Sequence, residues 1–483
     1  MSSEHSAPHR QPQVKSITIS LLLGLILASL DQTIVSTAMP TIINQLDGLS
    51  LYSWVFTVYM LASTATIPVY GKMADVFGRR NVYVIGLSLF LTGSVLCGFA
   101  GSITQLIVFR GIQGLGAGAL MPIAFTIVGD LYPPESRGKF MSLFSAVFSI
   151  SSILGPALGG LISQHLGWGW IFLINLPLGV PAICLMAAWK ETKRYTRKPF
   201  DWAGVVSFTI SIVSLLLALV FGGDSSGSSG HSTFVSPSVI ALFCLSALFL
   251  ALFLWIETKA TEPMLPLHLF KIRVIAFGNV AGFFMSAGMF GAITFIPLFA
   301  QDVMEVSPTY AGSILIPLML SVVVTTTLGG KLMSKVSYRA ILVPSLALMA
   351  IGFGLLGGMT ADTTPPQLVL YMIVTGLGMG AVYPVIGTAA QSAVGPTYRG
   401  VATASSQLFR SIGGTIGVSV LGSLLTQRIG SGVNELVDKM ILGDALNGIF
   451  LLGLGFVIIA LIACILMGNA RLVPKVNNVK QMP

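Results

Sequence analysis

The sequence predicts an all-α membrane protein with the major part of the chain in two parallel six-helix repeats and two extra helices between them. Three observations lead to this fold class: the composition, a series of apolar runs and an internal duplication. Of the 483 residues, 54% are hydrophobic and only 9% are charged, against roughly 25% charged residues in a typical soluble domain. The mean hydropathy is +0.87. This composition excludes a soluble globular protein.

Fourteen apolar runs follow one another along the chain, and each is long enough to cross a bilayer, which takes about 20 residues of α-helix. The runs lie near residues 16–39, 51–70, 81–100, 104–128, 140–163, 170–189, 202–222, 237–256, 274–300, 308–329, 340–359, 367–392, 401–426 and 446–469. We expect each run to form one of 14 transmembrane helices.

The positions of the basic residues agree with an even number of spans and with both termini in the cytoplasm. Cytoplasmic loops collect Lys and Arg, and with the N-terminus inside, the outer loops hold only Arg428 and Lys439. Arg110 and Arg410 lie within predicted spans, and the other 22 of the 26 basic residues fall on the inner side. This bias accounts for the net charge of +9, so the charge does not indicate a nucleic-acid partner.

An internal duplication relates the two halves of the chain. Residues 114–122 read GLGAGALMP and residues 376–384 read GLGMGAVYP, at an offset of 262. Glycine-rich apolar helices produce such patterns by chance, but the polar pattern P-x-x-R-G at 134–138 returns at 396–400 in the same register. An even number of spans separates the copies, so the repeat is parallel. Parallel repeats are one of the architectures of secondary transporters.

The offset leaves two spans over, and we place them between the halves. The predicted organisation is a disordered N-terminal tail (1–15), an N-terminal six-helix bundle (16–190), a linker with two additional transmembrane helices (191–271), a C-terminal six-helix bundle (272–470) and a C-terminal tail (471–483). The first run shares a basic start and small residues with secretory signal peptides. It is longer than a signal peptide and further spans follow, so we expect it to be retained.

Neither a catalytic set nor a metal site can be assembled from the sequence. Residues 223–227 read GDSSG, which fits the G-x-S-x-G nucleophile pattern, but they lie in a Ser/Gly-rich linker and not at a strand-to-helix turn. The five histidines lie outside the predicted spans and the four cysteines lie within them, which is typical of free buried thiols. We therefore predict no catalytic residue, no metal and no bound cofactor.

Asp31 is the only acidic residue well inside a predicted span, and ionisable residues at such depth are costly and usually functional. At 1.5 Å per residue, Asp31 lies about 12 Å and Arg110 about 9 Å below the outer surface, so the two can pair. Gln113, three residues after Arg110, lies on a neighbouring face and could join a polar network. The repeat position of Arg110 is Met372, so this charge is present in one half only.

The Asp31–Arg110 pair has two interpretations. A static ion pair would hold two helices together. A proton switch would work because burial favours the neutral form of a carboxyl group and a nearby guanidinium favours the charged form. A motion that separates Asp31 from Arg110 would then decide whether the carboxyl holds a proton.

Four segments, in chain order, resemble the major facilitator superfamily, and within it the 14-span drug:proton antiporter family of the EmrB/QacA type. They read LDQTIVSTAMP (30–40), GKMADVFGRRN (71–81), RGIQGLGAG (110–118) and GPALGG (155–160). In that family the arginine of the third segment is associated with proton transfer. The resemblance therefore implies proton coupling through Asp31 and Arg110.

The second segment carries the predicted inner-loop conformational lock. Its residues are Gly71, Asp75, Gly78, Arg79 and Arg80. A carboxylate is favoured near a helix N-terminus, where it can pair with the arginines, although the positive-inside bias alone would also explain the arginines. The equivalent segment GKLMSKVSYR at 330–339 lacks the acidic residue, so the lock is expected in one half only.

The fourth segment belongs to the fifth span and resembles a signature found mainly in exporters. Gly155, Pro156, Gly159 and Gly160 remove a backbone donor and side-chain bulk, so the helix can bend and be approached closely. Ordinary glycine packing is one explanation. The resemblance favours a hinge or seal that serves export.

The resemblance implies a proton-coupled multidrug efflux transporter of the cell membrane, a secondary active transporter and not an enzyme. It would export small amphipathic, often cationic compounds by alternating access, work as a monomer in the lipid bilayer, and use the proton gradient in place of any cofactor. An alternative is a dedicated exporter of a single metabolite, lipid or antibiotic. A membrane sensor or an intramembrane enzyme is a different class, but the first needs a soluble domain and the second a catalytic set.

Overall fold

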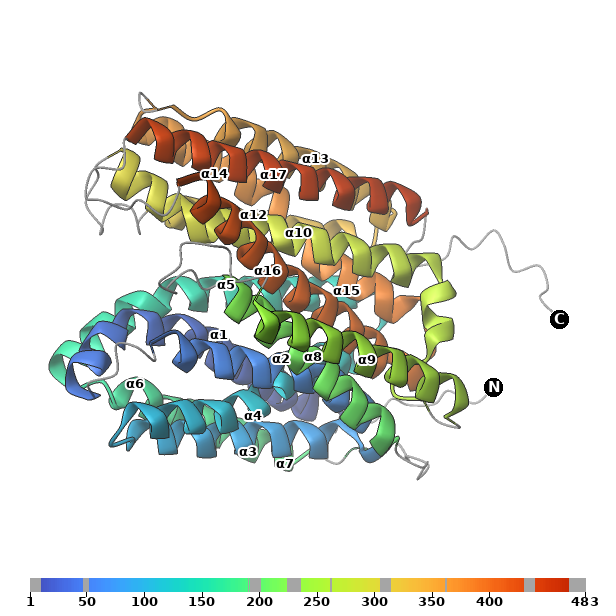
Figure 1. The fold of residues 1–483 in the computed structure, drawn as a ribbon. Coiled ribbons are helices and arrows are strands. Elements are labelled where there is room, and N and C mark those ends of the chain that lie inside the picture. The colour runs from blue at the N-terminus through green and yellow to red at the C-terminus, as the bar shows by residue number, and fades with distance from the viewer. Residues whose placement is uncertain are drawn as a thin grey trace, which may run out of the picture. The chain divides into compact units, whose positions relative to one another are not determined.

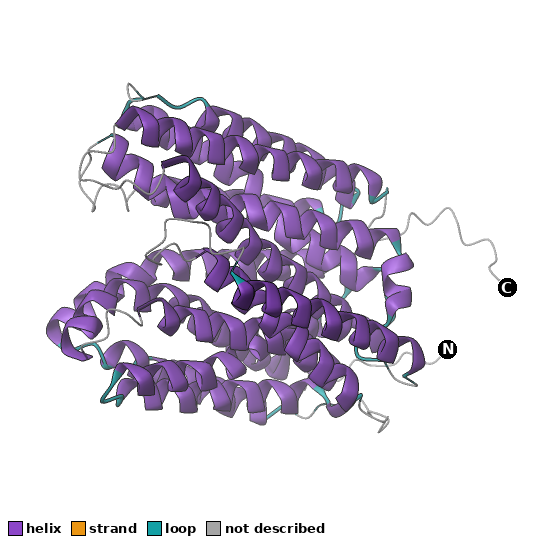
Figure 2. Ribbon diagram, in the orientation of Figure 1, coloured by secondary structure: helices purple, strands orange, loops and turns teal. Residues whose placement is uncertain are grey.

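The computed structural model describes residues 10–46, 52–189, 191, 201–223, 236–260, 263–304, 314–360, 363–429 and 439–468. Within these ranges the regular secondary structure is helical throughout (Figure 2). The first helix begins at Arg10 and so includes part of the predicted tail 1–15; the rest of that tail and the predicted C-terminal tail lie outside the described residues.

The chain divides into two compact units. The first unit holds residues 1–132 and 151–198, and the second holds 133–150 and 199–483. Helix α5, Pro134–His165, therefore contributes its two ends to different units. The bundle boundaries drawn from the sequence remain predictions.

The first unit is built around α4 (Figure 1). Its helices are α1 (Arg10–Leu46), α2 (Tyr52–Phe77), α3 (Arg79–Gly98), α4 (Ile103–Leu131), the second part of α5, α6 (Trp170–Leu173) and α7 (Asn175–Ala187). Helix α4 packs against α1, α2 and α3, while α7 packs against α1 and α3. The predicted run at 170–189 is thus two helices that meet at Ile174.

The second unit repeats this pattern and adds a helix pair. It contains α8 (Trp202–Gly223), α9 (Pro237–Lys259), η3 (Leu267–Lys271), α10 (Arg273–Leu298), the π-helical turn η4 (Phe299–Val303), α12 (Leu315–Leu332), α13 (Tyr338–Gly357), α14 (Pro365–Met379), α15 (Val382–Ser392), η5 (Pro396–Tyr398), α16 (Arg399–Ile429) and α17 (Lys439–Leu466). Helix α14 packs against α12 and α13, and α17 packs against α10 and α13. Helices α8 and α9 pack against each other, and α8 also contacts α16.

Glycines set the closest helix contacts in both units, in equivalent places. A Cβ atom added to Gly114 would lie 2.6 Å from a backbone oxygen of α2, and one added to Gly376 would lie 2.4 Å from a backbone oxygen of α12. For Gly118 and Gly380 the same distances are 2.6 and 2.2 Å. Any side chain at these four positions would collide with the neighbouring backbone, so the repeated glycines are packing faces of the small-xxx-small kind.

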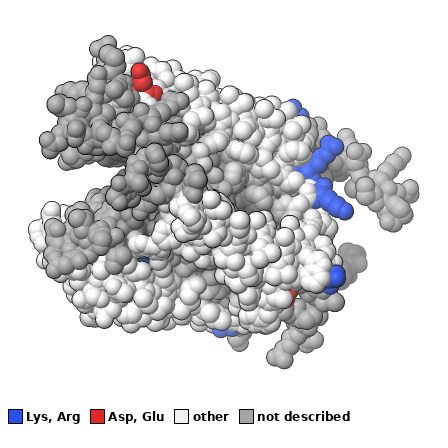
Figure 3. All heavy atoms as spheres, viewed as in Figure 1, with Lys and Arg blue, Asp and Glu red and all other residues white. Residues whose placement is uncertain are grey.

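Each of the fourteen predicted runs contains a helix, and in the described part of the chain eleven candidate spans are long and apolar enough to cross a membrane. The runs in α2, α5 and α16 form helices but are not among these eleven. Most of the face in Figure 3 is formed by uncharged residues, and the blue Lys and Arg atoms gather toward the end where α9 finishes and α10 begins. The chain is a multi-pass membrane protein.

The cysteines correct one sequence-based expectation. Cys97 and Cys464 are buried, as predicted, but Cys184 and Cys244 lie exposed on the surface of the isolated chain. The apolar runs alone could not separate a core-facing thiol from an outward-facing one. All four are free thiols.

Candidate functional site

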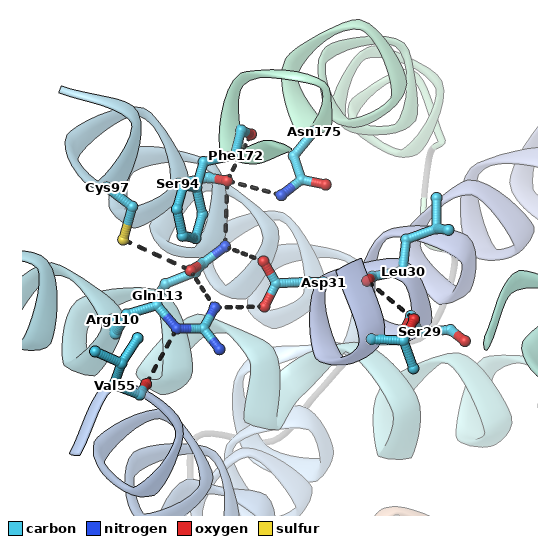
Figure 4. Close-up of polar contacts among 11 residues, drawn as sticks. Ser29, Leu30, Asp31, Val55, Ser94, Cys97, Arg110, Gln113, Phe172 and Asn175 are labelled. Atoms are coloured by element: carbon cyan, nitrogen blue, oxygen red, sulfur yellow. Dashed lines mark hydrogen bonds and ion pairs between the residues drawn. The ribbon is translucent and has the colours of Figure 1, made fainter. Parts of the chain in front are cut away.

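Asp31 of α1 and Arg110 of α4 form an ion pair inside the first unit (Figure 4). Nη1 of Arg110 lies 2.7 Å from Oδ2 of Asp31, and the two side chains are 1% and 0% exposed. The structure thus brings together the two charges that sequence depth alone had suggested could meet. A charge pair without solvent is expensive to desolvate and is retained only when further hydrogen bonds satisfy it.

Gln113 supplies those further bonds on one side. Its Nε2 donates to Oδ1 of Asp31 at 2.7 Å and to Oγ of Ser94 at 3.2 Å. Its Oε1 accepts from Nη1 of Arg110 at 2.8 Å and faces the thiol of Cys97, with Sγ 3.8 Å away. Gln113 is therefore an integral member of the network, as its spacing from Arg110 predicted.

Arg110 is also held by groups other than Asp31. Its Nε donates to the backbone carbonyl of Val55 at 3.3 Å. Its guanidinium carbon lies 4.0 Å from the centroid of the Tyr59 ring and 5.9 Å from that of Phe172. Cation–π contacts of this kind stabilise a desolvated guanidinium. The guanidinium of Arg110 is thus contacted by groups from α1, α2, α4 and α6.

Two polar residues that the sequence analysis missed complete the network. The hydroxyl of Ser94 in α3 donates to the carbonyl of Phe172 at 2.9 Å, and it accepts from Nδ2 of Asn175, the first residue of α7, at 2.8 Å (Figure 4). Both side chains are buried. An asparagine in an otherwise apolar stretch was a usable signal for Asn175, whereas a serine in a span is too common to single out Ser94.

The predicted lock centres on Arg79, which joins two carboxylates. Its Nη2 lies 3.1 Å from Oδ1 of Asp75, and its Nη1 lies 2.7 Å from Oδ2 of Asp130 in α4. The arginine side chain is 2% exposed. Asp130 was not singled out from the sequence, because it lies beyond the apolar run and looks like an ordinary helix-end residue.

The start of α3 is held from a distant point of the chain. Glu191, which follows α7, accepts from the backbone N–H of Arg79 at 3.3 Å and from that of Arg80 at 3.2 Å. The Arg80 side chain donates to the carbonyl of Ala187. Gly78, which precedes α3, has a φ of 97°, a conformation that favours glycine. Gly71 is a buried residue of α2.

The glycines of the α5 segment differ in their surroundings. A Cβ atom on Gly155 would lie 1.8 Å from Oγ1 of Thr33 in α1, whereas one on Gly160 would meet nothing within 4 Å. Gly159 is buried and Pro156 lies within the helix. Close packing on α1 therefore explains Gly155 and does not explain Gly160.

No group of three or more His, Cys, Asp or Glu side chains in the described part of the chain could hold a metal ion. The chemistry of the site comes from one carboxylate, one guanidinium and their hydrogen-bond partners. Such a site can bind, hold and release a proton, and it contains no nucleophile paired with a base.

Comparison with known proteins identifies the family. Residues 21–418, and separately 278–481, match the sequence profile described as the Major Facilitator Superfamily. The chain belongs to the major facilitator superfamily. It is 42% identical over 433 residues to the multidrug transporter protein MdtP of Bacillus subtilis (strain 168), a match that covers 89% of this chain and 78% of the relative. This superfamily member is therefore a transporter and not an enzyme.

Other relatives support the same assignment. The multidrug resistance protein 3 of the same Bacillus strain is 38% identical, with 89% of this chain and 83% of the relative covered. The efflux pump FUS6 of Gibberella fujikuroi is 30% identical, with 92% and 81% covered. Among solved structures, the human organic anion transporter MFSD10 matches with a TM-score of 0.65 at 16% identity, over 92% of this chain and 99% of that one. That likeness concerns the fold alone.

Proposed function

We propose that this chain is a proton-coupled multidrug efflux transporter that exports small amphipathic, often cationic compounds across the cell membrane by alternating access. The observation that carries the proposal is the fully buried Asp31–Arg110–Gln113 network between α1 and α4. Two relatives at about 40% identity are named as multidrug transport or resistance proteins. A titratable carboxylate is what such a pump needs in order to use the proton gradient.

The mechanism follows from the electrostatics of that network. With Asp31 charged, its attraction to Arg110 holds α1 against α4. A proton that binds Asp31 from the outside cancels this attraction, so α1 is free to move relative to α4. In the displaced position the carboxyl is open to the inner side and loses its proton there. The restored charge of Asp31 is then attracted to Arg110, which returns α1 to α4. The proton's downhill movement thereby drives substrate outward.

The finer architecture belongs to the same proposal. We infer fourteen transmembrane helices, with two parallel six-helix bundles and with α8 and α9 as the additional pair, as in the 14-span drug:proton antiporters. Both termini would lie in the cytoplasm, since the basic residues collect on that side. The Asp75–Arg79–Asp130 lock would hold the inner side in one conformation and open in the other. A single chain contains both halves, so a monomer suffices.

A dedicated exporter of a single metabolite, lipid or antibiotic is the second candidate. It is favoured by relatives such as the efflux pump FUS6, whose name does not include multidrug transport. A panel of structurally unrelated lipophilic cations and neutral compounds separates the two. Transport of one compound class alone would favour the dedicated exporter.

The test of the proposal uses the purified full chain in proteoliposomes. An imposed pH gradient should drive transport of tetraphenylphosphonium, and addition of this cation to the detergent-solubilised protein should release protons. Asp31→Asn should abolish both signals, because an amide cannot exchange a proton in this range. The matched control is Asp444→Asn, since Asp444 lies exposed on α17. Gradient-driven transport that survives in Asp31→Asn would refute the proton-carrier role.

A further inference from the structure

The hydrogen bonds around Asp31 suit only one protonation state. Its two partners, Arg110 and Gln113, both donate to it, one to each carboxylate oxygen, at 2.7 Å. A charged carboxylate accepts only, whereas a neutral carboxyl group must also donate its O–H. Arg110 has no acceptor to offer. Gln113 has one, Oε1, but that atom is turned away from Asp31, so between these two partners only a reversal of the amide would accommodate a protonated Asp31.

Ser94 prevents that reversal from the amino side of the amide. A hydroxyl carries a single hydrogen, and the hydrogen of Ser94 is used for the carbonyl of Phe172 at 2.9 Å. Toward Gln113, at 3.2 Å, Ser94 can therefore only accept. A reversed amide would place Oε1 against the oxygen of Ser94, two acceptors with no hydrogen between them. Burial of both side chains removes water as a substitute partner.

The carbonyl side of the amide is held as well. Oε1 of Gln113 accepts from Nη1 of Arg110 at 2.8 Å, and a reversed amide would set two donors against each other there. Arg110 does not follow Asp31 when the pair loses its attraction, because the carbonyl of Val55 and the ring of Tyr59 retain it. Protonation of Asp31 therefore breaks only the hydrogen bonds that Asp31 itself accepts, and Arg110 and Gln113 keep their other contacts.

We propose that Ser94 is a positioning residue that holds the amide of Gln113 as a donor toward Asp31, so that a protonated Asp31 finds no acceptor on either of its α4 partners and α1 is released from α4. This inference rests on the proposed function. Without the Ser94 hydroxyl only Arg110 still opposes the reversal of the amide. A neutral Asp31 can then stay bound to α4 in part, and protonation forces the helices apart less strongly. Ser94 does not touch the proton; it acts through Gln113.

Two other titratable side chains face the pair. Tyr59 on α2 and Cys97 on α3 interact electrostatically with both Asp31 and Arg110. The Tyr59 hydroxyl can donate or accept, so it is the other group able to receive the proton of a neutral Asp31. Tyr59→Phe removes this possibility and is measured beside the Ser94 variants. Helix α7 contributes the amide of Asn175 to the network, and this group does not titrate.

The experiment is a pH titration of the purified full chain, in which infrared spectroscopy follows the carbonyl band of the neutral Asp31 carboxyl. Asp31→Asn identifies the band. In Ser94→Ala the midpoint should move upward by about half to one pH unit, as expected when one orienting hydrogen bond to the charged form is lost. Ser94→Thr keeps the hydroxyl and should return the midpoint to the wild-type value. If Ser94→Ala does not fold, Gln113→Asn, whose shorter amide cannot reach both Ser94 and Asp31, should give the same upward shift.

The matched control is Ser20→Ala. The Ser20 hydroxyl is also buried and also donates to a backbone carbonyl, that of Ala182 at 2.6 Å, but it lies outside the Asp31 network. Its removal should leave the midpoint unchanged. An unchanged midpoint in Ser94→Ala, an equal shift in Ser20→Ala, or a shift that Tyr59→Phe reproduces in full overturns the positioning role while Asp31 remains the carrier. Absence of any Asp31-dependent band in the wild type would instead refute the proposed function, and this inference with it.

Discussion

Arg110 illustrates how much of a buried charge's stability comes from its partners. Its guanidinium contacts a carboxylate, an amide oxygen, a backbone carbonyl and an aromatic ring, all within the first unit. A buried pair of this kind adds little net stability compared with well-packed apolar residues, but removal of one partner leaves the other charge buried and unpaired. If the ion pair is important, a variant that lacks one of the two charges should therefore be less stable than a variant that lacks both.

We expect Arg110→Ala to lower the free energy of unfolding by about 3–5 kcal/mol, because the charge of Asp31 would remain buried and uncompensated. Asp31→Asn combined with Arg110→Gln removes both charges and should be less destabilising than Arg110→Ala alone. Thermal unfolding in detergent, followed by circular dichroism, measures the order. If the double variant is the less stable of the two, the ion pair is not the interaction that matters here.

At the scale of helices, the α5 segment shows that one sequence signature can contain two kinds of glycine. Gly155 allows α1 to approach, and its repeat counterpart Gly417 does the same for α10, since a Cβ atom there would lie 2.4 Å from Cα of Ala287. A Cβ atom added to Gly160 or to its counterpart Gly422 would meet no neighbour closer than 3.7 Å. The first pair is explained by packing. A glycine without a packing reason is the better candidate for a hinge.

Gly155→Val should destabilise the protein by about 1–3 kcal/mol or more, because the added carbons overlap Thr33. Gly160→Ala should fold with wild-type stability, because its new methyl group meets nothing within 4 Å. If α5 bends at Gly160 during transport, this alanine should nevertheless slow efflux several-fold. Stability by thermal unfolding and efflux in vesicles are measured on the same preparations. Wild-type efflux in Gly160→Ala would contradict a hinge at this position.

The Glu191 carboxylate, about 110 residues further along the chain, caps the first turn of α3. We expect Glu191→Gln to weaken the hydrogen bonds at that helix start. The loss should be about 0.5–2 kcal/mol, the usual contribution of a cap, and should appear as faster hydrogen exchange at the amides of Arg79 and Arg80. Asp201→Asn is the matched control, since Asp201 accepts from the N–H of Gly204 at the start of α8. Equal exchange at the α3 start in the wild type and Glu191→Gln would show that the cap is not needed.

Across the whole molecule, the duplication preserves packing and not chemistry. A Cβ atom added to Gly93 of α3 would lie 2.4 Å from the backbone nitrogen of Gln113, and one added to Gly352 of α13 would lie 2.9 Å from that of Thr375. Thr375 thus stands where Gln113 stands, and its hydroxyl donates to the carbonyl of Tyr371 in its own helix. Met372, at the position of Arg110, is fully buried among apolar residues. The arginine and the glutamine of the Asp31 network therefore occur in one copy only.

The inferred fourteen-span topology places the two ends of α9 on opposite sides of the membrane. In a variant without the four native cysteines, Ser236→Cys, just before α9, should react with an impermeant thiol reagent from outside intact cells. Ala260→Cys, just after it, should react only in inverted vesicles. Labelling of both positions from the same side would mean that α8 and α9 do not span the bilayer and that the count is lower.

Local properties of the sequence were enough for the class of protein and for most of its helices. Whether about 20 residues prefer a bilayer depends on those residues alone, and the cost of a lone buried charge marked Asp31 before any neighbour was known. The same reasoning could not find Ser94, Tyr59 or Glu191, nor separate the crowded Gly155 from the open Gly160. Those roles depend on how helices distant in the chain are rotated and shifted against each other. Hydrogen bonds demand that geometry to within a fraction of an ångström, so only the tertiary structure decided them.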